Sequence, residues 1–91
     1  MGQLTGMNGG WAAYRISKAT LNAITAALAD ELKPHGIAVN SMCPGWVRTD
    51  MGGPNAPRDV AEGASTAVSL ALDAPPSLTA SFVRDRQVIP W

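Results

Sequence analysis

The sequence predicts an α/β protein that forms one end of a larger, doubly wound domain with a parallel sheet. Its patterns follow the order helix, strand, loop, helix, strand over 91 residues. Two strands that are joined by a helix are expected to be parallel, and a parallel sheet needs helices on both faces and neighbouring strands at both edges. Two helices and two strands do not supply all of these neighbours. We therefore expect the chain to be the C-terminal portion of such a domain.

The first helix is expected to begin at Trp11 or Ala12 and to end near Lys33, because a proline and a glycine follow closely. At 100° per residue, one face of this helix carries Tyr14, Lys18, Leu21, Ile24, Thr25, Leu28 and Leu32. This pattern predicts a buried face that begins with a phenol and an ammonium. A buried cation needs polar partners, so the pair indicates a pocket for a polar ligand. The alternative is a surface pair in which the ring packs on the lysine stem.

A buried strand is predicted at 37–43, because this range is short, mostly apolar and bounded by glycine and proline. Side chains in a strand alternate in direction. One side is expected to carry Ile37, Val39, Ser41 and Cys43, and the other Ala38, Asn40 and Met42. The range 45–57 is rich in glycine and proline and poor in apolar residues, which predicts a surface loop of the kind that often covers a site.

A second helix is expected from Pro57 or Arg58 to about Leu72, with Asp59 and Glu62 near its positive end. One face of this helix carries Val60, Ala64, Ala67, Val68 and Ala71. Within the last segment, 81–91, a strand at Phe82 and Val83 precedes a polar turn and a second apolar pair, which predicts a strand or a short hairpin.

The composition excludes several classes of function. Lysine plus arginine equals aspartate plus glutamate at seven each, and no basic run is present, so nucleic acid and anionic membranes are not the expected partners. Cys43 is the only cysteine, which excludes an internal disulfide and a multi-cysteine zinc site and fits a reducing cytoplasm. We expect no metal site, no transmembrane segment, and a small molecule or a protein as partner.

Several motifs together resemble the short-chain dehydrogenase/reductase family over essentially the whole chain. In that family a Tyr-x-x-x-Lys pair opens a long helix, the next strand ends in Pro-Gly, and a Val or Ile and then a Thr follow at fixed offsets. The matching residues are Tyr14, Lys18, Pro44, Gly45, Val47 and Thr49. The C-terminal residues, from Phe82 to Trp91, are similar to the NADPH-preferring, carbonyl reductase-like branch. The resemblance implies a Rossmann-like fold and an NAD(P)-dependent oxidoreductase that interconverts a carbonyl and an alcohol.

The resemblance also implies roles for individual residues. It makes Tyr14 the general acid/base, while Lys18 favours the phenolate and hydrogen-bonds the nicotinamide ribose. The turn at Pro44 and Gly45 lets the nicotinamide approach the backbone. The same resemblance makes Val47 a backbone donor to the carboxamide. It places the hydroxyl of Thr49 near that group, with Trp46 beside the site.

The chain departs from the family pattern in its first ten residues. The glycines at positions 2, 6, 9 and 10 do not form a phosphate-binding turn, because no strand precedes them. The family's catalytic serine would fall at Met1 or before it, and Thr5 is too close to Tyr14 to replace it. We therefore expect residues 1–91 to be a partial domain without the dinucleotide-binding half, inactive alone, with NADP or NAD as the cofactor of the whole enzyme.

A second hypothesis is a non-catalytic interaction module. The first helix has a face of small side chains formed by Ile16, Thr20, Ala23 and Ala27, against which another helix can pack closely. On this interpretation the chain is a truncated paralogue that docks to a full-length reductase or forms a homo-oligomer. Binding of a dinucleotide by the chain would separate the two hypotheses.

Overall fold

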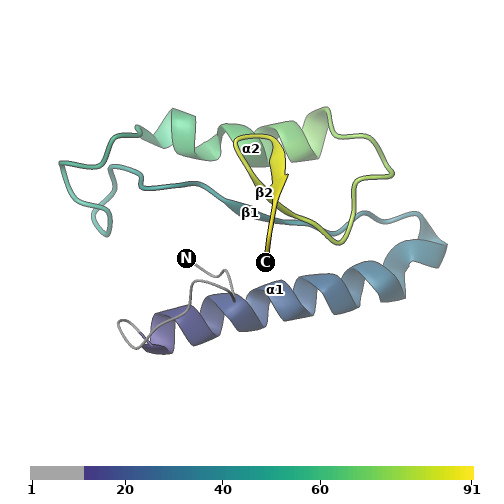
Figure 1. Cartoon of the computed structure of the whole chain (residues 1–91). Helices are drawn as coiled ribbons and strands as arrows, with labels where there is room; N and C mark the ends of the chain where they lie inside the picture. The colour runs from purple at the N-terminus through teal and green to yellow at the C-terminus, as the bar shows by residue number, and fades with distance from the viewer. Residues whose placement is uncertain (1–11) are drawn as a thin grey trace.

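The computed structural model describes residues 12–91 (Figure 1). The expectations that concern residues 1–11, including a helix start at Trp11 and the departures from the family pattern, lie outside the described residues. The elements in chain order are α1 (Ala12–Leu32), η1 (Lys33–His35), β1 (Ser41–Cys43), α2 (Val60–Leu72), β2 (Phe82–Arg84) and β3 (Gln87–Ile89).

The described chain has three layers, with a small sheet between the two long helices (Figure 1). On one face of β1, the Ser41 hydroxyl donates to the Thr25 hydroxyl of α1 at 2.7 Å, a contact that is buried. On the other face, Asn40 and Met42 line a hollow together with Leu70 of α2. The predicted alternation of side chains at the first strand is therefore confirmed, because Ser41 faces one helix while its neighbours face the other.

The sheet has the strand order β1-β2-β3. The pair β1 and β2 is parallel, with Met42 opposite Val83, as expected for strands that are joined by a helix. The pair β2 and β3 is antiparallel, with Val83 opposite Val88. The predicted hairpin is thus confirmed, and it adds a third strand to the two that the apolar pattern indicated.

A two-residue turn joins the strands of this hairpin. Asp85 and Arg86 both have positive φ, at 50° and 63°. Two positive φ values are typical of a type I′ turn, whose twist matches that of the flanking strands. Glycine and asparagine are the residues that usually form this turn. Beyond the hairpin, the ring of Trp91 stacks on the ring of Phe82, the first residue of β2, with the centroids 5.9 Å apart.

The regular part of the first strand is shorter than predicted, Ser41–Cys43 instead of 37–43. The residues before it are held by other bonds. The Asn40 amide donates to the Leu78 carbonyl at 2.9 Å and accepts the Ser81 N–H at 3.2 Å. The Ala80 N–H donates to the Val39 carbonyl at 2.9 Å. Side-chain bonds thus replace part of the strand ladder and fix the approach to β2.

The predicted buried face of the first helix is wrong in its large apolar residues. Leu21, Ile24 and Leu28 are 50, 49 and 40 per cent exposed. The side chains that α1 buries are Asn22, Thr25 and Ala29. Small side chains in this row let the helix approach β1 closely, whereas the large side chains remain about half exposed within the described residues 12–91.

The second helix begins at Val60, two or three residues later than expected. Asp59 is its N-cap and forms a capping box, in which its carboxylate accepts the Glu62 N–H at 2.7 Å while the Glu62 carboxylate accepts the Asp59 N–H at 3.2 Å. The residues that α2 buries are Gly63 and Thr66. The residues that were placed on one face of this helix, Val60, Ala64, Ala67, Val68 and Ala71, are all exposed.

The helices of the described chain are too short or too polar to cross a membrane.

Asn40→Ala tests whether the side-chain bonds of Asn40 hold the two parallel strands together. The substitution leaves the partly buried Ser81 N–H and Leu78 carbonyl without their partner. We expect the free energy of unfolding, measured by urea denaturation, to fall by about 1–3 kcal/mol. Asn55→Ala, in an exposed loop, is the matched control. Equal effects of the two substitutions would contradict the role of Asn40.

Candidate functional site

Tyr14 and Lys18 lie in the first two turns of α1 and contact each other. The Lys18 ammonium lies 5.4 Å from the centroid of the Tyr14 ring, within the range of a cation–π contact. Both residues are half-buried, so part of each remains accessible to solvent. The structure therefore brings together the pair that the sequence singled out, one helical turn apart near the start of α1.

The segment that leaves β1 turns at Gly45. Its φ of 79° lies in the left-handed region that glycine adopts readily. A Cβ at this position would stand 2.8 Å from Nε of Arg58. Gly45 therefore adopts a backbone conformation that favours glycine, and the lack of a side chain allows a close approach to its backbone. The group that approaches in this structure is the guanidinium of Arg58.

Val47 lies in the middle of a short parallel bridge with Arg58. The Arg48 N–H donates to the Arg58 carbonyl at 2.8 Å, and the Arg58 N–H donates to the Trp46 carbonyl at 3.3 Å. Because Trp46 and Arg48 make both bonds of this bridge, the N–H of Val47 points away from it. The Val47 side chain packs on α2 at Gly63, where a Cβ would come within 2.5 Å of a valine methyl group.

Trp46 and Thr49 close the loop that follows. The Trp46 indole N–H donates to the Gly52 carbonyl at 2.6 Å, and the Gly52 N–H donates to the Thr49 hydroxyl at 3.1 Å. The Thr49 carbonyl accepts the Gly53 N–H at 2.8 Å. These bonds shape the loop into tight turns, and Trp46 remains 56 per cent exposed beside it.

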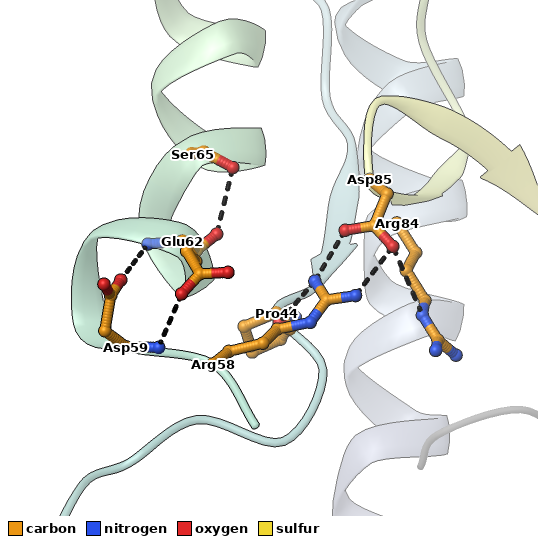
Figure 2. Close-up of polar contacts among 7 residues, drawn as sticks. All are labelled: Pro44, Arg58, Asp59, Glu62, Ser65, Arg84 and Asp85. Carbon is orange, nitrogen blue, oxygen red and sulfur yellow. Dashed lines mark hydrogen bonds and ion pairs between the residues drawn. The ribbon is translucent and has the colours of Figure 1, made fainter. Parts of the chain in front are cut away.

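Arg58 is a residue of this region that the sequence analysis did not identify. Its guanidinium forms a two-pronged ion pair with Asp85 of the β2–β3 turn, at 2.5 Å and 2.8 Å (Figure 2). It also donates to the Pro44 carbonyl at 3.1 Å. Arg84 lies 3.9 Å from the same aspartate. The only sequence signal was an arginine just before a helix cap and an Asp-Arg turn 27 residues later, and neither indicates a partner.

The ion pair changes the acidity of both groups. The hydrogen bond from Arg58, followed by its charge and that of Arg84, holds the pKa of the Asp85 carboxyl below its usual value, although burial acts in the opposite direction. The hydrogen bond to Asp85 raises the pKa of Arg58. Both side chains are partly exposed, so solvent weakens the attraction.

The predicted site residues fall into two groups on neighbouring elements. Tyr14 and Lys18 start α1, and the others, Pro44, Gly45, Trp46, Val47 and Thr49, follow β1. The start of α1 and the segment after β1 lie at the same end of the molecule (Figure 1). Two hollows are lined partly by residues of α2, and none of the predicted site residues lines either of them. Within residues 12–91, no cluster of histidine, cysteine, aspartate or glutamate could hold a metal ion.

Stability should depend on pH through Asp85. Because the folded state lowers the pKa of this carboxyl, its contribution is present above the unfolded pKa of about 4 and is lost as the pH falls through the folded value. We expect Asp85→Asn to lower the thermal midpoint near neutral pH and to flatten its decline below about pH 4. A matched variant, Asp50→Asn, lies in the exposed loop and should keep the wild-type profile. Parallel acid profiles for Asp85→Asn and wild type would contradict the account.

Comparison with known proteins places these features in a family. A family model described as short chain dehydrogenase matches residues 4–59. Carbonyl reductase [NADPH] 1 of Oryctolagus cuniculus is 44% identical over 91 residues, which cover 90% of this chain and 32% of the relative. Carbonyl reductase [NADPH] 3 of Rattus norvegicus is 43% identical with the same coverage of both chains. The chain spans about a third of the length of these curated relatives.

Solved structures agree with the sequence comparison. The carbonyl reductase Sniffer of D. melanogaster superposes with a TM-score of 0.88 at 38% identity, covering 99% of this chain and 37% of that one. An NADPH-bound carbonyl reductase from chicken fatty liver gives a TM-score of 0.85 at 28% identity, covering 99% of this chain and 39% of that one.

Proposed function

The chain belongs to the short chain dehydrogenase family, and we propose that it carries the tyrosine–lysine pair and the nicotinamide-facing segment of an NADPH-dependent carbonyl reductase. The observation that carries the proposal is the contact between Tyr14 and Lys18 at the end of the molecule where the segment after β1 also lies (Figure 1). The substrate class is a small carbonyl compound, reduced to an alcohol. The relatives named for NADPH favour this cofactor over NAD.

The residues after β1 have the backbone and side-chain groups that would suit the flat nicotinamide ring and its carboxamide. Pro44 has no N–H, and Gly45 has no side chain and a positive φ, so the backbone turns sharply at the strand end. The N–H of Val47 is not used by the bridge to Arg58, and within residues 12–91 it would be available to donate to a carboxamide. The Thr49 hydroxyl and the exposed Trp46 lie on the same short segment, where they would border the bound ring.

NADPH, when bound, supplies the hydride that reduces the carbonyl. Tyr14 would donate the proton that the carbonyl oxygen needs as it becomes an alcohol. The Lys18 ammonium, 5.4 Å from the ring centroid, would stabilise the negative charge that this transfer leaves on the phenol oxygen. The same ammonium carries three N–H donors and would also donate hydrogen bonds to the ribose hydroxyls of the cofactor. Both side chains are half-buried, which leaves part of each accessible to ligands.

A second candidate function is docking to another protein. The large side chains Leu21, Ile24 and Leu28 of α1 and the small-residue face that begins at Ile16 are all exposed. These surfaces would suit a full-length reductase or a second copy of the chain. Size-exclusion chromatography with titration of NADPH separates the two functions, since association without dinucleotide binding would favour docking.

Tyr14→Phe tests the proposed acid/base role. We expect a chimera, in which the first two-thirds of the rabbit carbonyl reductase precede this chain, to reduce small carbonyl compounds with NADPH. Tyr14→Phe in the chimera should lower kcat by about 10²- to 10⁴-fold, the usual contribution of a positioned proton donor. Kinetics are followed by NADPH absorbance, and circular dichroism checks the fold.

The same substitution should leave the KM for NADPH nearly unchanged, because the phenol acts on the substrate oxygen. Ser17→Ala is the matched control, since its hydroxyl only donates to the Tyr14 carbonyl within the helix. Full turnover by the Tyr14→Phe chimera would refute the mechanism.

A further inference from the structure

We propose that Arg58 and Asp85 form a positioning pair that holds the strand-exit segment, residues 44–49, in the conformation that receives the nicotinamide. The inference rests on the proposed function for its purpose, but the contacts that carry it belong to the chain itself. Arg58 lies outside the motifs that carried the family resemblance, and Asp85 lies in the C-terminal segment that resembles the carbonyl reductase-like branch, where no role was assigned to it. The pair joins three places that are distant in sequence: the exit from β1, the start of α2, and the β2–β3 turn (Figure 2).

Arg58 holds the strand-exit segment from two directions. Its backbone bonds to Trp46 and Arg48, on either side of Val47. Its side chain donates to the Pro44 carbonyl at 3.1 Å and lies against the backbone of Gly45. One residue therefore fixes the beginning and the middle of the segment, and with them the direction of the N–H of Val47.

Asp85 fixes the arginine in turn. Its two oxygens accept both terminal nitrogens of the guanidinium, at 2.5 Å and 2.8 Å, which is the planar geometry that restricts an arginine most strongly. The aspartate itself lies in the two-residue turn between β2 and β3, where its φ is 50°. Arg84 is a weaker neighbour, since it lies 3.9 Å from Asp85 and half of its side chain is exposed.

The capping box adds rigidity next to the arginine. Asp59, the following residue, is tied to Glu62 by two reciprocal bonds at the start of α2 (Figure 2). The helix start therefore provides a fixed base from which the Arg58 side chain reaches the strand exit. The hairpin β2–β3 is connected to the candidate cofactor site through this chain of contacts, although its own residues lie outside that site.

Hydrogen exchange on the full chain is the first test. The Arg48 N–H reports the bridge, since it donates to the Arg58 carbonyl, which every variant retains. We expect Arg58→Gln to accelerate its exchange by about tenfold, the factor that corresponds to one charge-assisted hydrogen bond. Asp85→Asn should act similarly, and the double variant should be no worse than either single one. Arg84→Gln is the matched control, with an expected change below about twofold.

Steady-state kinetics of the chimera is the second test. Arg58→Gln should raise the KM for NADPH by about tenfold with a smaller change in kcat. Arg58→Lys should recover part of the lost affinity, because lysine keeps the positive charge but cannot form the two-pronged hydrogen bond of the guanidinium. A purely structural role would lower the amount of folded enzyme without shifting KM. The inference is overturned by unchanged Arg48 exchange, by additive effects of the two substitutions, or by an unchanged KM.

Failure of the proposed function and failure of the Arg58–Asp85 pair to position the segment give different results. If the unsubstituted chimera binds no NADPH, the proposed function and the purpose assigned to the pair are refuted, while the exchange data still decide whether the pair holds the segment. If the chimera binds NADPH and the Arg58 variants do so equally well, only the positioning inference is refuted.

Discussion

The parallel pairing of β1 with β2 is the constraint on which the rest of the structure depends. It joins residues about 40 positions apart, and the short ladder from Ser41 to Cys43 is extended by the side-chain bonds of Asn40. Because the two strands are parallel, their carboxyl ends lie at the same edge of the sheet. The strand exit at Pro44 and the turn at Asp85 are therefore neighbours, and Arg58 can bridge them. Ligands of open α/β sheets bind at this kind of edge.

The two sides of the sheet serve different purposes in this arrangement. The side toward α1 is packed through small and polar groups, such as the hydroxyls of Ser41 and Thr25. This packing determines the position of α1, which carries Tyr14 and Lys18. On the side toward α2, the Val47 side chain of the segment that follows β1 packs against Gly63. Each helix therefore determines the position of one part of the candidate site, and the sheet holds the two parts at one end of the molecule (Figure 1).

Much of the fold followed from local patterns. The sequence predicted the end of the first helix near Pro34, the polar turn of the hairpin and the turn at Gly45. These predictions were possible because proline, glycine and polar clusters restrict the backbone directly. The fold class and the family are confirmed by the solved relatives and the family model. The buried face of α1 was predicted only in part. Thr25 is buried as expected, but hydrophobicity also favoured Leu21 and Leu28, which are exposed, whereas close packing on the sheet selected Ala29. The Arg58–Asp85 pair was not predictable, since it depends on the register of strands distant in sequence. The roles of Tyr14, Lys18 and the strand-exit residues stay predictions.

The central claim is that the start of α1 and the exit from β1 together face one nicotinamide ring. The most direct test is nuclear magnetic resonance of the chimera with isotope labels in residues 1–91 and NADP⁺ bound. The account predicts nuclear Overhauser effects from the nicotinamide protons both to the Tyr14 ring and to the Val47 amide. Contacts from those protons to neither residue, or only to residues along α2 such as Leu70, would contradict it.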